Sequence, residues 1–180
     1  YGERFLEEVK TLPAFVDSKS KGREILQLKI EDKPKGLDAI LESLKANVDT
    51  PGLNPASGGH LGYIPGGGLF YSALADYLAA VSNRYAGIFF ASPGAVYIEN
   101  SLVDWMAKTV GYGKKAKGSL LSGGSIANLT AIVTARDALK IKSKNVKKTV
   151  VYLTSQAHHC IDKALKIAGL GEVVQRFIPM

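Results

Sequence analysis

Residues 149–178 read TVVYLTSQAHHCIDKALKIAGLGEVVQRFI, and this stretch decides the class of fold. The short apolar run 149–153 predicts a buried strand, and the amphipathic run 158–168 predicts a helix. Glycines at 169 and 171 end that helix, and residues 173–178 predict a second strand. Strand, helix and strand with short connections indicate a mainly parallel sheet with helices on its faces, which is an α/β fold.

Apolar residues at helical spacing also predict helices upstream, over residues 2–16, 37–48, 72–84, 95–110 and 125–139. Residues 119–121 predict one more short strand. Three strands are few for so many amphipathic helices, so we expect more chain or a partner to cover the helices. We expect an N-terminal helical segment over residues 1–55 and the first, incomplete part of a larger α/β domain over residues 56–180.

Composition narrows the possible functions. The 180 residues are 46% hydrophobic, which is ordinary for a globular protein, and no apolar run is long enough to cross a bilayer. The net charge of +7 could suggest nucleic acid, but no aromatic residues interleave with the lysines of residues 140–148, so we expect a solvated surface and no nucleic-acid partner. The single cysteine, Cys160, permits no internal disulfide and predicts a cytoplasmic protein.

A loop rich in glycine and proline occupies residues 54–68. Such a loop loses much conformational entropy when it is ordered. It nevertheless contains Tyr63 and Ile64, which favours an ordered loop against a ligand or a partner.

A strand-to-helix junction lies at residues 120–128, which read LLSGGSIAN. Glycines let a ligand approach the backbone, and the first N–H groups of the following helix attract an anion. The simpler alternative is that Ser125 merely caps the helix. The spacing fits neither the nucleoside-triphosphate loop nor the dinucleotide fingerprint.

A second junction lies at residues 156–160, QAHHC, and three interpretations compete there. A metal site needs several convergent ligands, and adjacent residues should point apart, so we expect no metal. A nucleophilic Cys160 beside a histidine is possible, but a residue at this place in a helix is more often part of the core. Structural capping by His158 is the simplest interpretation.

Several short motifs occur together in the order of a known family. They are GHLGYIP at 59–65, SALAD at 72–76, ASP at 91–93, SGGSIAN at 122–128 and QAHH at 156–159. Through them the chain resembles the amino-terminal part of the group II pyridoxal-phosphate-dependent amino acid decarboxylases, which include aromatic-L-amino-acid, glutamate and 2,4-diaminobutyrate decarboxylases. The resemblance implies a large domain of the aspartate-aminotransferase type (fold type I), working as a homodimer.

The resemblance also implies roles for particular residues. His158 matches the histidine that stacks on the pyridoxal ring and acts in catalysis. Gly124 and Ser125 match the turn that binds the phosphate of pyridoxal 5'-phosphate. Tyr63, Ile64 and Pro65 match the loop that lines the substrate pocket.

The implied activity is that of a lyase that removes CO2 from an L-amino acid. The family needs a lysine that bonds to the cofactor and an aspartate that pairs with its ring nitrogen. Lys163, Lys166 and Asp162 do not match these residues, so we expect both in a remaining C-terminal part, in the same or a separate chain, and expect the 180 residues alone to be inactive. The alternatives are a non-catalytic remnant or assembly module, an aldehyde synthase and a carbon–carbon lyase. Aromatic, acidic and diamino acids all remain open as substrates.

Overall fold

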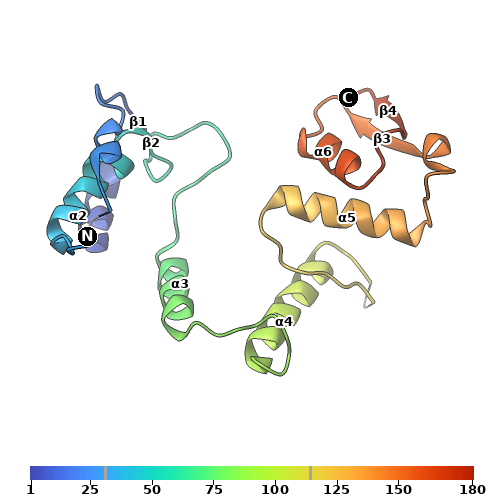
Figure 1. Ribbon diagram of the computed structural model, residues 1–180, viewed down its shortest axis with the longest axis horizontal. Coiled ribbons are helices and arrows are strands. Elements are labelled where there is room, and N and C mark those ends of the chain that lie inside the picture. The colour runs from blue at the N-terminus through green and yellow to red at the C-terminus, as the bar shows by residue number, and fades with distance from the viewer. Residues whose placement is uncertain (31, 114) are drawn as a thin grey trace. The chain divides into compact units, whose positions relative to one another are not determined.

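The structure is a computed structural model that describes residues 1–30, 32–113 and 115–180 (Figure 1). Its contacts divide the chain into two units, Tyr1–Asn83 and Arg84–Met180. The predicted division into residues 1–55 and 56–180 stays a prediction, because the two units are defined by contacts within this chain alone. Each unit is described separately.

The first unit consists mainly of short helices. Its elements are α1 (Gly2–Glu8), η1 (Val9–Thr11), β1 (Phe15–Val16), η2 (Arg23–Gln27), α2 (Leu37–Leu44), η3 (Lys45–Asp49), β2 (Gly52–Leu53) and α3 (Phe70–Ser82). The predicted helices at 37–48 and 72–84 are confirmed as α2 with η3 and as α3.

The predicted helix over residues 2–16 is wrong in its second half. Regular helix ends at Glu8, and Leu12 is extended (φ −64°, ψ 129°). A proline disfavours the helical conformation of the preceding residue, so Pro13 explains this end. Phe15 and Val16 then pair antiparallel with Leu53 and Gly52, in a ribbon that no local pattern reveals.

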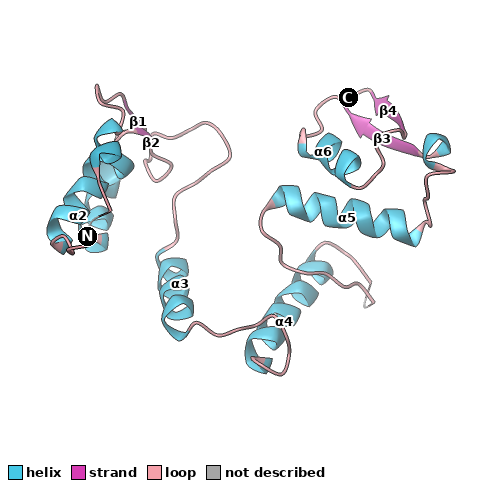
Figure 2. Cartoon of the chain, viewed as in Figure 1, coloured by secondary structure: helices cyan, strands magenta, loops and turns pink. Residues whose placement is uncertain are grey.

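The second unit contains the α/β part. Its elements are α4 (Pro93–Thr109), α5 (Gly124–Ala138), η4 (Val146–Lys148), β3 (Val150–Thr154), α6 (Cys160–Ile167) and β4 (Val174–Ile178). β3 and β4 pair in parallel, from Val150 opposite Val174 to Thr154 opposite Ile178. α6 lies between these two strands in the chain, as the sequence predicts, and Figure 2 shows it beside the paired strands.

A small core joins α5 and α6 to the start of the sheet. Its buried members are Val146, Leu165, Ala168, Leu170 and Val173, and Leu129, Ile132, Val133, Ile141, Val151 and Ile161 pack against them. The amphipathic pattern of α6 explains this packing, because Cys160, Ala164 and Leu165 are buried on one face.

Two predictions about strands need correction. Residues 119–121 form no strand, and the Leu120 N–H instead donates to Glu99 Oε1 at 3.1 Å. β3 is half-buried, whereas the sequence predicts a buried strand over residues 149–153, and the second predicted strand is β4, whose residues are exposed. Residues 119–121 have no strand beside them among the described residues, and the sheet of β3 and β4 has only two strands, so it leaves β3 partly exposed.

Large apolar side chains remain exposed along the two helices that precede the α/β part. Tyr77, Leu78 and Val81 of α3 and Ile98 and Trp105 of α4 each expose more than half of their surface. No described helix combines the length and apolar character that a membrane span requires.

Candidate active site

The first of the two junctions, at residues 120–128, contains the start of helix α5. The helix begins at Gly124, and its N-cap is Gly123, which adopts φ +84° and ψ 164°. No side chain among the described residues caps this helix, so the suggestion that Ser125 acts as the cap is wrong. Ser125 is instead the second helical residue. The first N–H groups of α5 therefore have no intrahelical partner and point out from the helix end.

The surroundings of this helix end suit an anion. A Cβ built on Gly124 would meet no atom within 4 Å among the described residues, so the backbone is accessible there. The first turn of α5 contains no acidic side chain that would repel a negative charge. The Ser125 hydroxyl adds a donor at the same turn. These features fit the phosphate group of a cofactor.

The second junction follows β3. A turn closed by the Ala157 N–H and the Thr154 carbonyl oxygen (3.1 Å) leads from the strand to α6. His158 is exposed, and its Nδ1 accepts the N–H of Cys160, the first residue of α6, at 3.2 Å. The N-cap of α6 is His159, which makes no side-chain capping bond, so His158 lies one residue before the cap and its ring accepts the first N–H of the helix. This bond uses one ring nitrogen and leaves the plane of the imidazole available for stacking.

The rings of His158 and His159 lie together, with centroids 4.0 Å apart and planes 37° apart. The expectation that these adjacent side chains point apart is therefore wrong. Cys160 is buried, as expected for a core position. Within the described ranges, no three His, Cys, Asp or Glu side chains come together as metal ligands.

Asn128 connects the two junctions. Its Nδ2 donates to the Gly124 carbonyl oxygen at 2.9 Å and to Cys160 Sγ at 3.5 Å. The first turns of α5 and α6 are thus side by side in one unit, which Figure 1 also shows. The structure therefore brings Gly124 and Ser125 close to the segment of His158. Sequence reasoning missed Asn128, although an asparagine side chain can bond to the backbone carbonyl four residues before it.

The predicted substrate loop lies in the first unit. Tyr63 has a left-handed backbone (φ +66°), and its ring stacks on His60 with centroids 6.3 Å apart and planes 14° apart. Tyr63 and Ile64 expose 82% and 97% of their surface, and Pro65 is also exposed. These residues belong to the other unit from His158, so their place in the same site stays a prediction.

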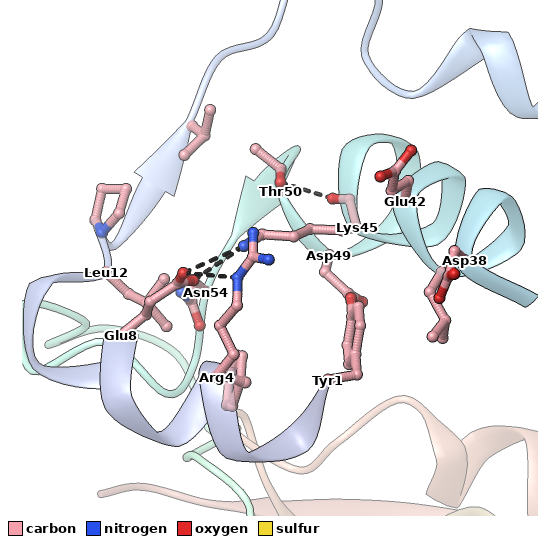
Figure 3. Close-up of a pocket in the computed structure, with 14 residues that line it drawn as sticks. Tyr1, Arg4, Glu8, Leu12, Asp38, Glu42, Lys45, Asp49, Thr50 and Asn54 are labelled. Atoms are coloured by element: carbon pink, nitrogen blue, oxygen red, sulfur yellow. Dashed lines mark hydrogen bonds and ion pairs between the residues drawn. The ribbon is translucent and has the colours of Figure 1, made fainter.

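A pocket of about 420 Å³ lies elsewhere, among α1, α2 and η3 of the first unit (Figure 3). Glu8 receives Lys45 Nζ at 3.0 Å and Arg4 Nε at 3.2 Å there, and these two cations hold the pKa of the Glu8 carboxyl below its usual value. Tyr1 donates to the Asp49 carboxylate on the other side of the pocket. An ion pair between Glu8 and Lys45 and a hydrogen bond between Tyr1 and Asp49 thus join α1 and its N-cap to η3.

The chain is similar in sequence to a known family and to several characterised proteins. The sequence model described as "Pyridoxal-dependent decarboxylase conserved domain" matches residues 20–180. An aromatic-L-amino-acid decarboxylase of Bacillus atrophaeus is 37% identical over 109 residues, which are 61% of this chain and 22% of that protein. A phenylacetaldehyde synthase of Petunia hybrida is 30% identical over 156 residues, which are 82% of this chain and 31% of that protein.

Among solved structures, Oryza sativa TDC with PLP and tryptamine superposes with a TM-score of 0.81 at 22% identity. The match covers 99% of this chain and 41% of that one. This likeness confirms the predicted fold, an α/β part of the fold-type-I large domain. The chain thus spans about a fifth to two fifths of the proteins that it matches.

Proposed function

The chain belongs to the pyridoxal-dependent decarboxylase family, and from this premise we propose that it forms the amino-terminal part of an L-amino-acid decarboxylase. The complete enzyme would be a lyase that releases the α-carboxylate of its substrate as CO2 and leaves an amine. The proposal concerns the whole protein, because the chain spans less than half of the relatives named above. Pyridoxal phosphate is the cofactor of the family.

Gly124 and Ser125 would hold the phosphate of that cofactor. Support comes from the uncapped first turn of α5, from the free space beside Gly124 and from the lack of acidic residues in that turn. The backbone N–H groups and the helix dipole would bind the dianion, and the Ser125 hydroxyl would donate one further hydrogen bond.

His158 would stack on the cofactor ring through the face turned away from His159. Because its Nδ1 accepts the Cys160 N–H, the neutral imidazole has its proton on Nε2, from which it would donate to the substrate carboxylate. When bound, the cofactor supplies an electron-accepting ring for the electron pair left by the departing carboxylate. His158 would fix the plane of that ring and orient the bond that breaks.

Tyr63, Ile64 and Pro65 would line the substrate pocket. The exposure of Tyr63 and Ile64 leaves apolar surface that a substrate side chain can bury. Together with the aromatic-L-amino-acid decarboxylase relative, this makes aromatic L-amino acids the first substrate class to test.

The observation that carries the proposal is the side-by-side position of the two junctions, bridged by Asn128. The test uses the complete protein. Pyridoxal phosphate is titrated in while visible absorbance is recorded, and CO2 and amine are then measured with tryptophan, tyrosine, glutamate and 2,4-diaminobutyrate. We expect a visible absorbance band and an amine product. A protein that shows neither would contradict the proposal and would support a non-catalytic remnant.

Ser125→Ala separates cofactor binding from folding. We expect this variant to bind pyridoxal phosphate more weakly while the cofactor-free protein melts close to the wild-type temperature, because Ser125 does not cap α5. An equal loss of thermal stability without cofactor would show that Ser125 is only structural.

An aldehyde synthase is the second candidate. It is favoured by the 30% identical phenylacetaldehyde synthase relative, which spans 82% of this chain. The two activities differ in their product, since a decarboxylase forms an amine and a synthase forms an aldehyde. Product analysis with an aromatic substrate therefore distinguishes them.

We also propose a cytoplasmic homodimer. The exposed apolar side chains of α3, and separately those of α4, support contacts with further protein surface. The single, free cysteine supports a reducing compartment. Light scattering on the purified complete protein tests the dimer, and fractionation of cells tests the compartment.

A further inference from the structure

The amide group of Asn128 lies where α5 and α6 meet. Its Nδ2 atom has two hydrogens, and it donates to two acceptors on different segments. One is the carbonyl oxygen of Gly124 at 2.9 Å, in the first turn of the same helix, and the other is Cys160 Sγ at 3.5 Å, in the first turn of α6. Asn128 is itself exposed, so it adds little to the buried core.

Cys160 in turn holds the imidazole of His158. Its backbone N–H donates to His158 Nδ1 at 3.2 Å. Two short links therefore join the first turn of α5 to the histidine ring, from Gly124 through Asn128 to Cys160, and from Cys160 to His158. The first link fixes a helix end, and the second fixes the orientation of a ring.

We propose that Asn128 is a positioning residue that sets the distance between the phosphate-binding turn of α5 and the ring of His158. This inference rests on the proposed function, in which one pyridoxal phosphate contacts both the first turn of α5 and the ring of His158. A cofactor that is gripped at its phosphate and stacked on its ring needs both contacts in a fixed relation. Asn128 touches neither group and acts through Gly124 and Cys160.

The rest of the packing does not replace this link. The buried core residues Leu165 and Ala168 lie beyond the first turn of α6, and Arg136 Nη1 donates to the Ala168 carbonyl oxygen at 2.8 Å. Leu129 and Ile161, nearer the two helix starts, are only partly buried. Loss of Asn128 should therefore leave the helices packed and loosen only their first turns. A positioning role for Asn128 therefore predicts weaker cofactor binding with little change in the melting temperature.

The test uses the complete protein and three variants. Asn128→Ala removes both hydrogen bonds. Asn128→Ser retains a hydroxyl that can bond back to the Gly124 carbonyl but cannot reach Cys160, so it removes only the link between helices. Thr134→Ala is the matched control, because Thr134 also lies exposed on α5 and bonds back to a carbonyl, that of Thr130, at 2.7 Å.

Three quantities are measured: the dissociation constant for pyridoxal phosphate, the circular dichroism of the bound cofactor in the visible range, and the melting temperature of the cofactor-free protein. We expect Asn128→Ala and Asn128→Ser each to raise the dissociation constant about tenfold and to reduce the visible dichroism. We expect their melting temperatures to stay near that of Thr134→Ala.

The outcomes distinguish this inference from the proposed function. A wild-type protein that does not bind pyridoxal phosphate would overturn both. A wild-type protein that binds it, with Asn128→Ser equal to wild type in affinity and dichroism, would overturn only the role of Asn128. If Asn128→Ala does not fold, Asn128→Ser decides the question.

Discussion

Arg136 of α5 donates a hydrogen bond from Nη1 to the carbonyl oxygen of Ala168 at 2.8 Å, and Ala168 is the C-cap of α6. The last carbonyl groups of a helix lack intrahelical partners and have partial negative charge. The guanidinium of α5 therefore caps α6, and it holds the two helices together at the end opposite Asn128.

We expect Arg136→Ala to lower the melting temperature of the protein by roughly 2 to 4 °C, because it leaves this carbonyl end without its charged donor. Lys147→Ala is the control, because the ion pair of Lys147 with Glu172 is exposed on both sides and should contribute little. Differential scanning calorimetry measures both variants. Equal shifts in the two variants would contradict the capping role.

The two glycines at the start of α5 should respond differently to alanine. Gly123 has a backbone conformation (φ +84°, ψ 164°) that is open essentially to glycine alone, so Gly123→Ala should cost about 1 to 3 kcal/mol of stability. Gly124 lies in the helix, and no atom of the described residues comes within 4 Å of a Cβ added there, so Gly124→Ala should leave folding intact.

Gly124→Ala should nevertheless weaken the binding of pyridoxal phosphate, because its methyl group would occupy the space proposed for the phosphate. Chemical denaturation and cofactor titration measure the two effects separately. Unchanged cofactor affinity in Gly124→Ala would remove Gly124 from the binding site.

Most features that depend on neighbouring residues in the sequence were predicted correctly, whereas several that depend on distant contacts were not. α5 was predicted over residues 125–139 and runs over Gly124–Ala138, because its helical spacing and its glycine start are local properties. The parallel pairing of β3 and β4 also followed from order and connection length. The predicted strand at 119–121 failed because a strand exists only beside a neighbour, which the local pattern does not contain.

The site shows the same division. The sequence places Gly124, Ser125 and His158 beside helix starts, and the family resemblance predicts their roles, which stay predictions. It did not identify Asn128, whose contact with Cys160 depends on how α5 and α6 pack. Nor could it detect that Gly123, and not Ser125, is the N-cap, because the local pattern does not show at which residue the helical conformation begins.

The stability of the first unit should depend on pH through Glu8. Lys45 and then Arg4 lower the pKa of this carboxyl below its ordinary value of about 4.5. A carboxyl with a lowered pKa in the folded state stabilises that state above its unfolded pKa, and this contribution is lost as the pH falls through the folded pKa. We therefore expect a loss of stability on acidification below about pH 4.5.

Urea unfolding between pH 3 and 7 measures this dependence, and Glu8→Gln should reduce it. Glu7→Gln is the control on the same helix, since Glu7 forms no ion pair within the described residues. The pairing of Glu8 would be irrelevant to stability if the two variants showed the same pH profile.

His158→Ala should reduce turnover by the complete enzyme strongly, by about 100-fold or more, because it removes both the stacking ring and the Nε2 donor. The fold should remain, since His158 is exposed and contributes only one hydrogen bond to the start of α6. Steady-state kinetics and far-UV circular dichroism measure the two effects. Turnover near the wild-type value would remove His158 from the active site.

A crystal structure of the complete protein with pyridoxal phosphate is the most direct measurement. We expect the phosphate oxygens to accept hydrogen bonds from the first N–H groups of α5 and from the Ser125 hydroxyl, and the ring of the cofactor to lie flat against the imidazole of His158. A cofactor whose phosphate is bound away from Gly124 and Ser125, or whose ring does not reach His158, would contradict the account.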